Sequence, residues 1–298
     1  MYDLIDNEDI PGLDREDDPT LSRFKKKLPK GYLSVSQVNL YTRCGEQYYR
    51  RYVLGEQVPS TFPQVQGRGV HKAAEKLHLR IIETGHGYTD PEEMVQEYSD
   101  LFDKEVQQVD LSLAQLVDPD QDPGALKDVG VRLTRKYHAG AMGHIRNPDT
   151  GHFYPSVMPV AAERIVEKEV TTEDGDKVPF LGVIDLEEPF ALADLKTRAK
   201  IAGQAEVDNN LQLTMYAYLA EKYTVRMDQL VKPSKKLPER YVRTEARRDQ
   251  QEVEHVLSVV GEVADDIARG RFRKTSPENW WCSIKMCPYW GQCRGKVR

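Results

Sequence analysis

The chain has 298 residues, of which 39% are hydrophobic and 30% are charged, enough for one large domain or two small ones with a real core. It contains no apolar run near the roughly 20 residues that cross a bilayer, and residues 1–20 lack the apolar stretch of a secretory signal peptide. We therefore expect a cytoplasmic protein with no membrane partner. In that reducing compartment, clustered cysteines favour metal binding over disulfides.

Charge is distributed unevenly along the chain. The formal net charge is −6, but residues 1–20 alone carry eight acids and Arg15, a net of −7. Residues 231–298 carry 15 lysines and arginines against nine acids, a net of +6. A basic carboxyl-terminal part is compatible with a partner that carries phosphates, although such charges are more often simply solvated surface.

The amino-terminal part reads as a polar tail followed by helices. Residues 1–30 are acidic, contain prolines and lack apolar periodicity, which predicts a disordered tail. Order is expected from LSVSQVNLYTRCGEQYYRRYVLG, residues 33–55, where Ser34 or Ser36 can cap a helix. The next predicted helix, residues 67–85, has an apolar stripe made of Val70, Ala74, Leu77 and Ile81.

Two more helices are expected before the hydrophobic period changes. Asp90 and Pro91 suit the N-cap and the first helical position of a helix over 90–109. A loop rich in Asp and Pro, residues 117–123, separates it from a basic helix over about 124–146. These two helices predict a helical insertion over about 85–150.

Strands dominate the next part of the chain. Alternation and turn residues predict three strands, then a helix, a fourth strand and a final helix. The expected ranges are 157–170, 178–188 and 190–197 for the three strands, 207–223 for the helix, 239–244 for the fourth strand and 247–270 for the final helix. The sequence contains no internal repeat and no glycine-rich phosphate loop.

Two acids and a lysine gather on the second and third of these strands. Asp194 and Lys196 point to one face because side chains alternate along a strand, and the tight turn can bring Asp185 beside them. Two carboxylates can hold Mg²⁺ or Mn²⁺, and the lysine can orient or deprotonate a water. A surface hairpin with scattered charges is the simpler alternative, but the intervening residues predict a core sheet. These are Ile184, Leu186, Ala193 and Leu195.

Three further side chains could join the acids and the lysine. His71 lies near the start of the helix at 67–85, where a lone histidine is more often structural than a ligand. Gln212 and Tyr216 are four residues apart and therefore share one helix face. That pair is weak by itself, because it is also what a packed tyrosine with a polar neighbour looks like.

The four cysteines form a second pattern. Three of them lie in WWCSIKMCPYWGQC, residues 280–293, and Cys44 is the best candidate for a fourth ligand. This density suits Zn²⁺ or an iron–sulfur cluster, and spacing alone slightly favours zinc. Four unrelated cysteines are a poor explanation beside aromatic residues that could shield a bound group. Those aromatic residues are Trp280, Trp281, Tyr289 and Trp290.

In their order along the chain, these residues resemble the RecB-type nuclease domain of the PD-(D/E)XK superfamily. The matching pieces are His71, Gly182-Val-Ile-Asp185, Asp194-Leu-Lys196-Thr197 and Gln212-x-x-x-Tyr216. One cysteine before these motifs and three after them are similar to the iron–sulfur branch of the family, which includes AddB-type nucleases, CRISPR-adaptation exonucleases and phage-encoded relatives. The likeness spans roughly residues 32–293.

The resemblance implies a role for each matching residue. Metal ligands would be His71, Asp185, Asp194 and the carbonyl of Leu195, and the catalytic residues would be Asp185, Asp194 and Lys196. Gln212 and Tyr216 would help to place DNA. The resemblance also favours a [4Fe–4S] cluster over zinc, with the ligands Cys44, Cys282, Cys287 and Cys293.

The sequence departs from the family pattern at two positions and leaves one choice open. Gly45 follows the first cysteine where a proline is common, and four residues separate Cys282 from Cys287 where two are frequent. Neither departure removes a ligand. On the first strand, Glu163 or Glu169 could add an acid to the site, and the sequence does not choose between them.

We predict an α/β fold with a restriction-endonuclease-like core, in which a central mixed sheet is flanked by helices. It would form one nuclease domain over 31–298, with an iron–sulfur segment over about 277–298. The expected function is a Mg²⁺- or Mn²⁺-dependent DNA exonuclease in recombination, repair or processing, with a helicase or recombination protein as a candidate partner. Two alternatives stay open: a catalytically weak DNA-binding recombination or adaptation subunit, and a zinc-stapled RNA-processing nuclease.

Overall fold

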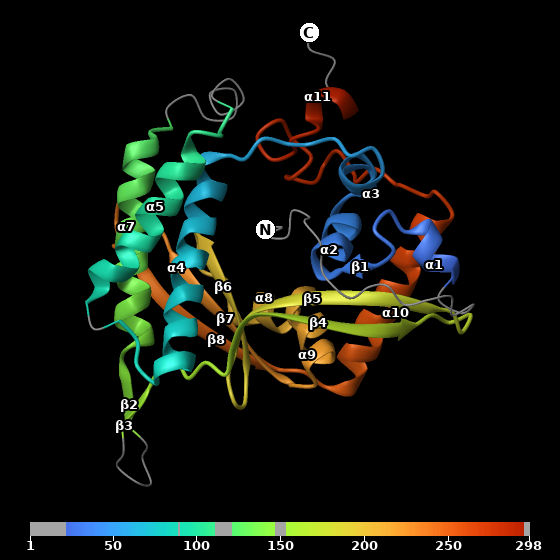
Figure 1. Ribbon diagram of the computed structural model, residues 1–298. Coiled ribbons are helices and arrows are strands. Elements are labelled where there is room, and N and C mark those ends of the chain that lie inside the picture. The colour runs from blue at the N-terminus through green and yellow to red at the C-terminus, as the bar shows by residue number, and fades with distance from the viewer. Residues whose placement is uncertain (1–21, 89, 111–120, 147–152, 295–298) are drawn as a thin grey trace.

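The centre of the molecule is a six-stranded mixed sheet (Figure 1). The computed structural model describes residues 22–88, 90–110, 121–146 and 153–294. The strands are β1 (Leu33–Ser34), β4 (Ala161–Thr171), β5 (Lys177–Glu187), β6 (Leu192–Arg198), β7 (Thr224–Val231) and β8 (Arg240–Arg247). Their order is β1-β5-β6-β7-β8, and β4 pairs with β5 as well. Because β1–β5 and β6–β7 are parallel and the other pairs antiparallel, the predicted mixed sheet is confirmed.

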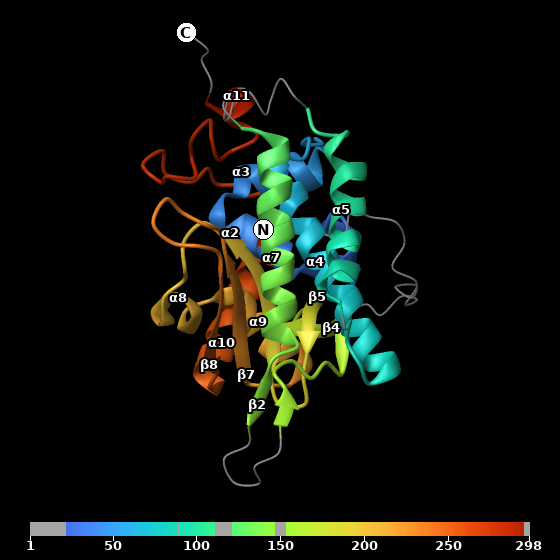
Figure 2. The same cartoon turned by 90° about the vertical axis from the view of Figure 1, so that its left-hand side faces the viewer.

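Helices flank this sheet in two groups (Figures 1 and 2). A bundle of α4 (Phe62–Thr84), α5 (Pro91–Val106) and α7 (Pro123–Ala141) encloses one hydrophobic core with the sheet. The helices α1 (Ser22–Lys27), α2 (Val35–Arg43), α9 (Leu211–Ala220) and α10 (Gln250–Ala268) enclose a second core. None of the described helices is both long and apolar enough to cross a membrane.

Shorter elements connect these layers. They are α3 (Gly45–Tyr48), the π-helix η1 (Tyr49–Val53), α8 (Gln204–Asp208), α11 (Trp290–Cys293) and the small hairpin of β2 (His144–Arg146) and β3 (Phe153–Pro155). In Figure 1, α3 and the red segment that contains α11 lie together at one end of the molecule, near the start of α4.

Local signals predicted several helix starts. Ser34 is the N-cap of α2, and Asp90 is the N-cap of α5. The helix α4 begins at Phe62, earlier than the predicted residue 67, because Thr61 and Gln64 form a reciprocal capping box. The apolar stripe predicted for this helix is buried as expected, except that its last member is only partly buried.

The strands that carry the predicted acids also agree with the sequence, apart from their ends. The predicted ranges 157–170, 178–188 and 190–197 correspond to β4, β5 and β6. The four apolar residues between and beside the acids are all buried: Ile184, Leu186, Ala193 and Leu195. The hairpin of β5 and β6 therefore lies in the core.

Three predicted boundaries were wrong. Residues 22–30, assigned to a disordered tail, contain α1, and Phe24 of this helix is fully buried in the second core. The basic helix expected to reach residue 146 ends at Ala141, because residues 144–146 pair with 153–155. The helix expected over 207–223 is split into α8 and α9, since Asn210 caps the second one. Residues 1–21 and most of the loop at 117–123 lie outside the described residues.

The strand β7 is absent from the sequence prediction although it is central in the sheet. It runs parallel to β6 and antiparallel to β8. Arg226 and Asp228 within it are buried and paired, with Nε and Oδ1 2.7 Å apart. Two charged residues at buried positions break the apolar run that is typical of a central strand, which is why the sequence pattern did not indicate one.

Candidate metal site and four-cysteine site

The candidate metal site begins with two opposed carboxylates on β4 and β5. Arg164 pairs with Ile184 in this antiparallel ladder, so Glu163 stands opposite Asp185. Like charges directly opposite each other destabilise a sheet. Glu163 also has a left-handed backbone, with φ of 47°, which costs a residue other than glycine about 1–3 kcal/mol. Both features indicate a position shaped by function rather than by sheet stability.

His71 completes a group of three metal-binding side chains. It lies on α4, is buried, and its Nδ1 is 3.6 Å from Asp185 Oδ2. One ligand atom each from His71, Glu163 and Asp185 lie within 4.8 Å of one another. An imidazole with two carboxylates suits a divalent ion such as Mn²⁺, and the carboxylate oxygens also suit Mg²⁺.

Glu163, and not Glu169, is the glutamate of β4 that joins the site. Glu169 lies toward the other end of the hairpin, where its Oε2 is 3.0 Å from Nζ of Lys177. Glu163 lies across from Asp185 and is the acid in the group of three. The sequence could select Glu163 only if the register of the two strands were known. The turn alone does not fix that register to within one residue.

The backbone of Leu195 orients the site. Its N–H donates to Asp185 Oδ2 at 2.8 Å, which holds one oxygen of that carboxylate in place. The Leu195 backbone also hydrogen-bonds with His71. The residue that was predicted to offer a carbonyl to the metal therefore touches two members of the group of three.

Asp194 and Lys196 form a second part of the site, together with α9. Lys196 Nζ donates to Asp194 Oδ1 at 2.8 Å, and Gln212 Nε2 lies 3.0 Å from the same oxygen. Gln212 Nε2 is also 2.8 Å from the hydroxyl of Tyr216, so the predicted pair does share one helix face. Asp194 is only 1% exposed and is not a member of the group of three, so its role as a metal ligand remains a prediction.

Burial controls the protonation of the site. Desolvation, reinforced by Lys196, lowers the pKa of His71 to about 3, so the imidazole is neutral and can bind a cation. Burial raises the pKa of Glu163 to about 8, and Asp185 adds to this effect. Burial also raises the pKa of Asp185, and it raises that of Asp194 to about 6 against the opposing effect of Lys196. A bound cation would favour the ionised carboxylates that burial disfavours.

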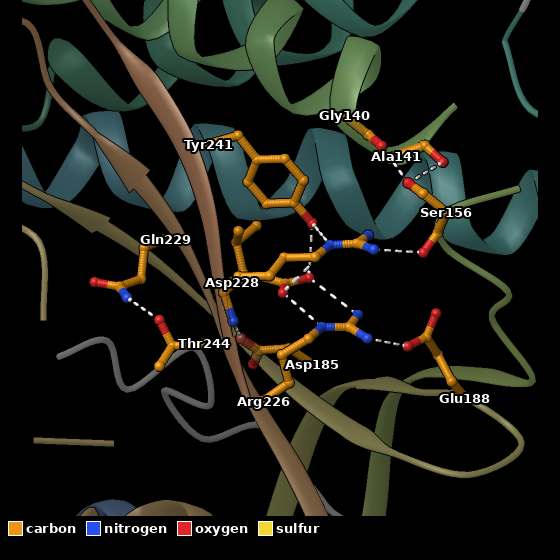
Figure 3. Close-up of polar contacts among 12 residues, drawn as sticks. Gly140, Ala141, Ser156, Asp185, Glu188, Arg226, Asp228, Gln229, Tyr241 and Thr244 are labelled. Carbon is orange, nitrogen blue, oxygen red and sulfur yellow. Dashed lines mark hydrogen bonds and ion pairs between the residues drawn. The ribbon is translucent and has the colours of Figure 1, made fainter. Parts of the chain in front are cut away.

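A buried ion network lies beside these residues (Figure 3). Arg226, 4% exposed, donates from Nε and Nη2 to the two oxygens of Asp228 at 2.7 and 3.2 Å, and from Nη1 to Glu188. The Tyr241 hydroxyl donates to Asp228 Oδ2 at 2.9 Å. Because these residues come from β7, β8 and the end of β5, the network ties three strands together next to the acids.

The network reaches the cavity of the metal site. That cavity is lined by the group of three and also by Asp228, His78 and Tyr137. His78 Nε2 lies 2.7 Å from the Tyr137 hydroxyl, and burial lowers the pKa of His78 to about 4. No motif in the sequence indicated that these residues belong to the site. One signal was available, since His71 and His78 are seven positions apart and so share a face of α4.

The four cysteines line one small cavity between α3 and the segment 271–294, which we call the four-cysteine segment. Cys44 and Cys287 are buried, and Cys282 and Cys293 are partly exposed. Gln47 Nε2 lies 3.2 Å from Cys287 Sγ. Four thiols around one cavity are a donor set that fits a shared metal ion or cluster.

Gly45, a departure from the family pattern, permits a close crossing of two chain segments. A Cβ at this position would lie 2.8 Å from the backbone nitrogen of Arg273. The missing side chain therefore lets residues 272–273 pass directly over the start of α3. This contact brings the four-cysteine segment against the backbone that follows Cys44.

The aromatic residues of this segment differ in burial. Tyr289 is buried, and its hydroxyl donates to the carbonyl of Glu56 at 3.0 Å. Trp281 and Trp290 are partly buried. Trp280 is 68% exposed, so the shielding predicted for all four aromatic residues does not extend to this one.

A search of curated proteins finds no match to the chain. Among solved structures, the fold is similar to that of the protein SSO0001, with 13% identity, a TM-score of 0.41 and coverage of 95% of this chain and 100% of that chain. It is also similar to a protein from Eubacterium rectale described as a candidate exonuclease, with 13% identity, a TM-score of 0.42 and coverage of 91% and 93%. Likeness at this level carries no activity over to this chain.

Comparison with a family sequence model is more informative than comparison with the solved structures. A sequence model of the PD-(D/E)XK nuclease superfamily matches residues 32–294, which include the acids, the lysine and all four cysteines. The central mixed sheet flanked by helices is consistent with the restriction-endonuclease-like core of that superfamily. Its members are nucleases that use divalent metal ions, which agrees with the group His71, Glu163 and Asp185. The chain belongs to the PD-(D/E)XK nuclease superfamily.

Proposed function

We propose that this protein is a metal-dependent DNA exonuclease of the RecB-type iron–sulfur branch. The observation that carries the proposal is the group His71, Glu163 and Asp185, with Lys196 and Asp194 on the adjoining strand. A neutral imidazole, opposed acids and a lysine in one buried site suit the hydrolysis of a phosphodiester.

Each of these residues has a defined task in hydrolysis. The ligands of the ion would be His71, Glu163 and Asp185, joined by Asp194 and the Leu195 carbonyl. A bound Mg²⁺ or Mn²⁺ supplies Lewis-acid activation of the phosphodiester and lowers the pKa of a water. The Leu195 N–H fixes one oxygen of Asp185, which leaves the other oxygen for the ion. Lys196, held by Asp194, orients or deprotonates the attacking water, or balances the charge that develops on the phosphate.

Three features support DNA as the substrate. Gln212 and Tyr216 match the motif that helps to place DNA, and Gln212 contacts Asp194. Residues 231–298 have a net charge of +6, which suits a phosphate backbone. The ordered set of motifs resembles exonucleases that act in DNA recombination, repair or processing, some of them phage-encoded, and this likeness makes a helicase or recombination protein the candidate partner.

We also propose that the four cysteines bind a [4Fe–4S] cluster, with zinc as the alternative. The cavity lined by all four thiols supports a shared group. Protein purified without oxygen should be brown and contain iron and sulfide. A colourless protein with one zinc ion per chain and no iron would overturn the cluster and leave the nuclease assignment intact.

The test of the nuclease assignment is digestion of end-labelled single- and double-stranded DNA with Mg²⁺ or Mn²⁺. We expect Asp185→Asn and Lys196→Ala each to lower the cleavage rate by about 10²–10⁴-fold, the range typical for loss of one acid–base or charge-stabilising group. Asp174→Asn is the matched control for the first variant. Asp174 is exposed in the turn at the other end of the β4–β5 hairpin, so cleavage should be unchanged.

Other outcomes would select the alternatives. Cleavage of labelled RNA but not DNA would favour the zinc-stapled RNA-processing nuclease. DNA binding without cleavage, under metal conditions that saturate the site, would favour the catalytically weak recombination or adaptation subunit. Near-normal Mg²⁺-dependent cleavage by folded Asp185→Asn would contradict the assignment of the site itself.

A further inference from the structure

The four-cysteine segment exposes an aromatic ring that the cysteine site does not use. Trp280 is 68% exposed, and its ring meets Trp281 edge to face with centroids 5.7 Å apart. Most of the indole therefore faces solvent, while Tyr289 in the same segment is buried and fixed by a hydrogen bond. An exposed indole offers a flat face on which another aromatic ring can stack.

The same segment is rich in positive charge. Residues 271–294 contain five lysines and arginines and one acid, Glu278, a net of +4. Arg273, Lys274 and Lys285 are exposed. Within the described part of the chain, no ion pair neutralises any of these three side chains. The exposed indole is thus accompanied by cationic groups that are available to an anionic ligand.

The segment is also anchored to the body of the protein. The Tyr289 hydroxyl donates to the Glu56 carbonyl at 3.0 Å, and Gln47 Nε2 lies 3.2 Å from Cys287 Sγ. At Gly45, the crossing of residues 272–273 holds the start of the segment against α3. Anchoring lowers the ordering entropy that a ligand must overcome when it binds.

The position of the segment relates it to the metal site. In Figures 1 and 2 it lies at the same end of the molecule as the start of α4. His71 follows nine residues after Phe62, the first residue of α4, which corresponds to about 14 Å along the helix axis. At about 3.4 Å per nucleotide of one strand, this part of α4 corresponds to about four nucleotides.

We propose that Trp280, with Arg273, Lys274 and Lys285, forms a binding surface for single-stranded DNA. An unpaired base would stack on the indole while the cations contact the neighbouring phosphates, a combination used by proteins that bind single strands. A duplex does not suit this surface, because its bases are already stacked on each other. The inference rests on the proposed function and specifies that the DNA substrate is single-stranded where it binds.

The first test measures binding of a short fluorescein-labelled oligothymidylate by anisotropy, in EDTA so that no cleavage occurs. Trp280→Ala should raise Kd roughly five- to a hundredfold, the effect of losing one base–aromatic stack, whereas Trp280→Phe should keep most of the affinity. Phe190→Ala is the matched control, because Phe190 is 84% exposed in the turn between β5 and β6. The strands β5 and β6 lie apart from the segment that contains α11 (Figure 1). Its Kd should equal that of the wild type.

The second test measures the salt dependence of the same binding. Each phosphate contact on a single strand contributes about 0.7 to the slope of log K against log salt, so Arg273→Ala with Lys285→Ala should reduce the slope by about 1.4. Lys274 is left unchanged because it lines the cysteine cavity. The double variant Lys104→Ala with Lys136→Ala, exposed on α5 and α7, is the charge control and should leave the slope as it is.

Several outcomes would overturn the binding surface. An unchanged Kd in Trp280→Ala, or an equal loss for an unnicked blunt duplex and for the oligothymidylate, would do so. So would an unchanged salt slope in the Arg273/Lys285 variant. Metal content and circular dichroism of Trp280→Ala must match the wild type, and the salt slope of the Arg273/Lys285 variant supplies the test if they do not. Tryptophan-dependent binding by a protein that cleaves nothing would instead retain the surface and defeat the nuclease proposal.

Discussion

The metal site and the four-cysteine segment both gather ligands, but they do so in opposite ways. The residues of the candidate metal site stand on β4, β5, β6 and α4, and hydrogen bonds within the protein already orient Asp185 and Asp194. The four-cysteine segment has one regular element, the four-residue helix α11, and otherwise consists of irregular chain, turns and bends. The fold alone can therefore arrange the first site, whereas regular structure does little to arrange the second, for which we propose that a metal ion or cluster holds the thiols together.

The largest expected effect on stability comes from the buried ion network beside the metal site. Arg226→Met leaves Asp228 and Glu188 buried without their cation, which should lower the free energy of unfolding by about 3–5 kcal/mol in urea denaturation. Arg135→Met removes an exposed pair with Glu92 and should change stability very little, because water screens that pair. Equal small losses in both variants would show that the buried network does not hold the site.

The next effect concerns the metal ion or cluster that we propose for the four-cysteine segment. A group present at a hundred times its Kd contributes about 2.7 kcal/mol, so Cys44→Ser should lower stability by about that amount or more. Cys282→Ser should cost as much, and the double variant no more than either. Iron or zinc analysis with urea denaturation measures this. Titration of these variants with Mn²⁺ should give the same affinity at the metal site as in the wild type. Loss of Mn²⁺ binding together with the cysteine-bound group would show that the two sites depend on each other.

A smaller effect should follow from filling the crossing point at Gly45. The Cβ of Gly45→Ala would lie 2.8 Å from the Arg273 backbone, and overpacking of this kind costs about 1–3 kcal/mol. Gly291→Ala, in α11 of the same segment, meets nothing within 4 Å and should be neutral or slightly stabilising. Thermal unfolding of the two variants checks this. A neutral Gly45→Ala would mean that the two chain segments can separate freely.

The smallest effect is a pH dependence confined to the metal site. The pKa of Glu163 is raised to about 8 from 4.5, so this group favours folding most when it is protonated, and the metal-free protein loses that contribution as the pH rises from about 4.5 to about 8. A bound cation replaces the proton. For each pH unit inside this window, the rise in Tm caused by Mn²⁺ should therefore grow by a few degrees, since one unit corresponds to about 1.4 kcal/mol and each kcal/mol to about 2–4 °C. Glu163→Gln should weaken this trend, and a trend of undiminished size in that variant would assign it elsewhere.

The sequence predicted the parts of the fold in which local pattern and burial agree. Alternation placed β4, β5 and β6, and cap residues such as Ser34 and Asp90 placed helix starts. It failed at β7, where Arg226 and Asp228 satisfy each other inside the sheet. A buried ion pair looks like surface charge in a sequence, because nothing local reveals the partner strand.

In the metal site too, local sequence pattern predicted some residues and not others. Asp185, Asp194 and Lys196 could be placed from two neighbouring strands, and the contacts of Asp194 with Lys196 and Gln212 agree with that placement. Glu163 could not be selected, because its place opposite Asp185 depends on the register of two strands. The exposure of Trp280 was also hidden, since burial within an irregular segment follows no period.

The placement of the cysteines along the chain bears on the order of assembly. Cys44 comes before every strand of the sheet except β1, and Cys282, Cys287 and Cys293 come after all of them. A chain that is synthesised from its amino terminus therefore produces all the strands of the metal site before a second thiol exists. If the thiols bind the proposed group, its insertion is a late step of maturation. The cell's supply of iron or zinc then sets what fraction of the synthesised chains has Cys44 joined to the three carboxyl-terminal cysteines.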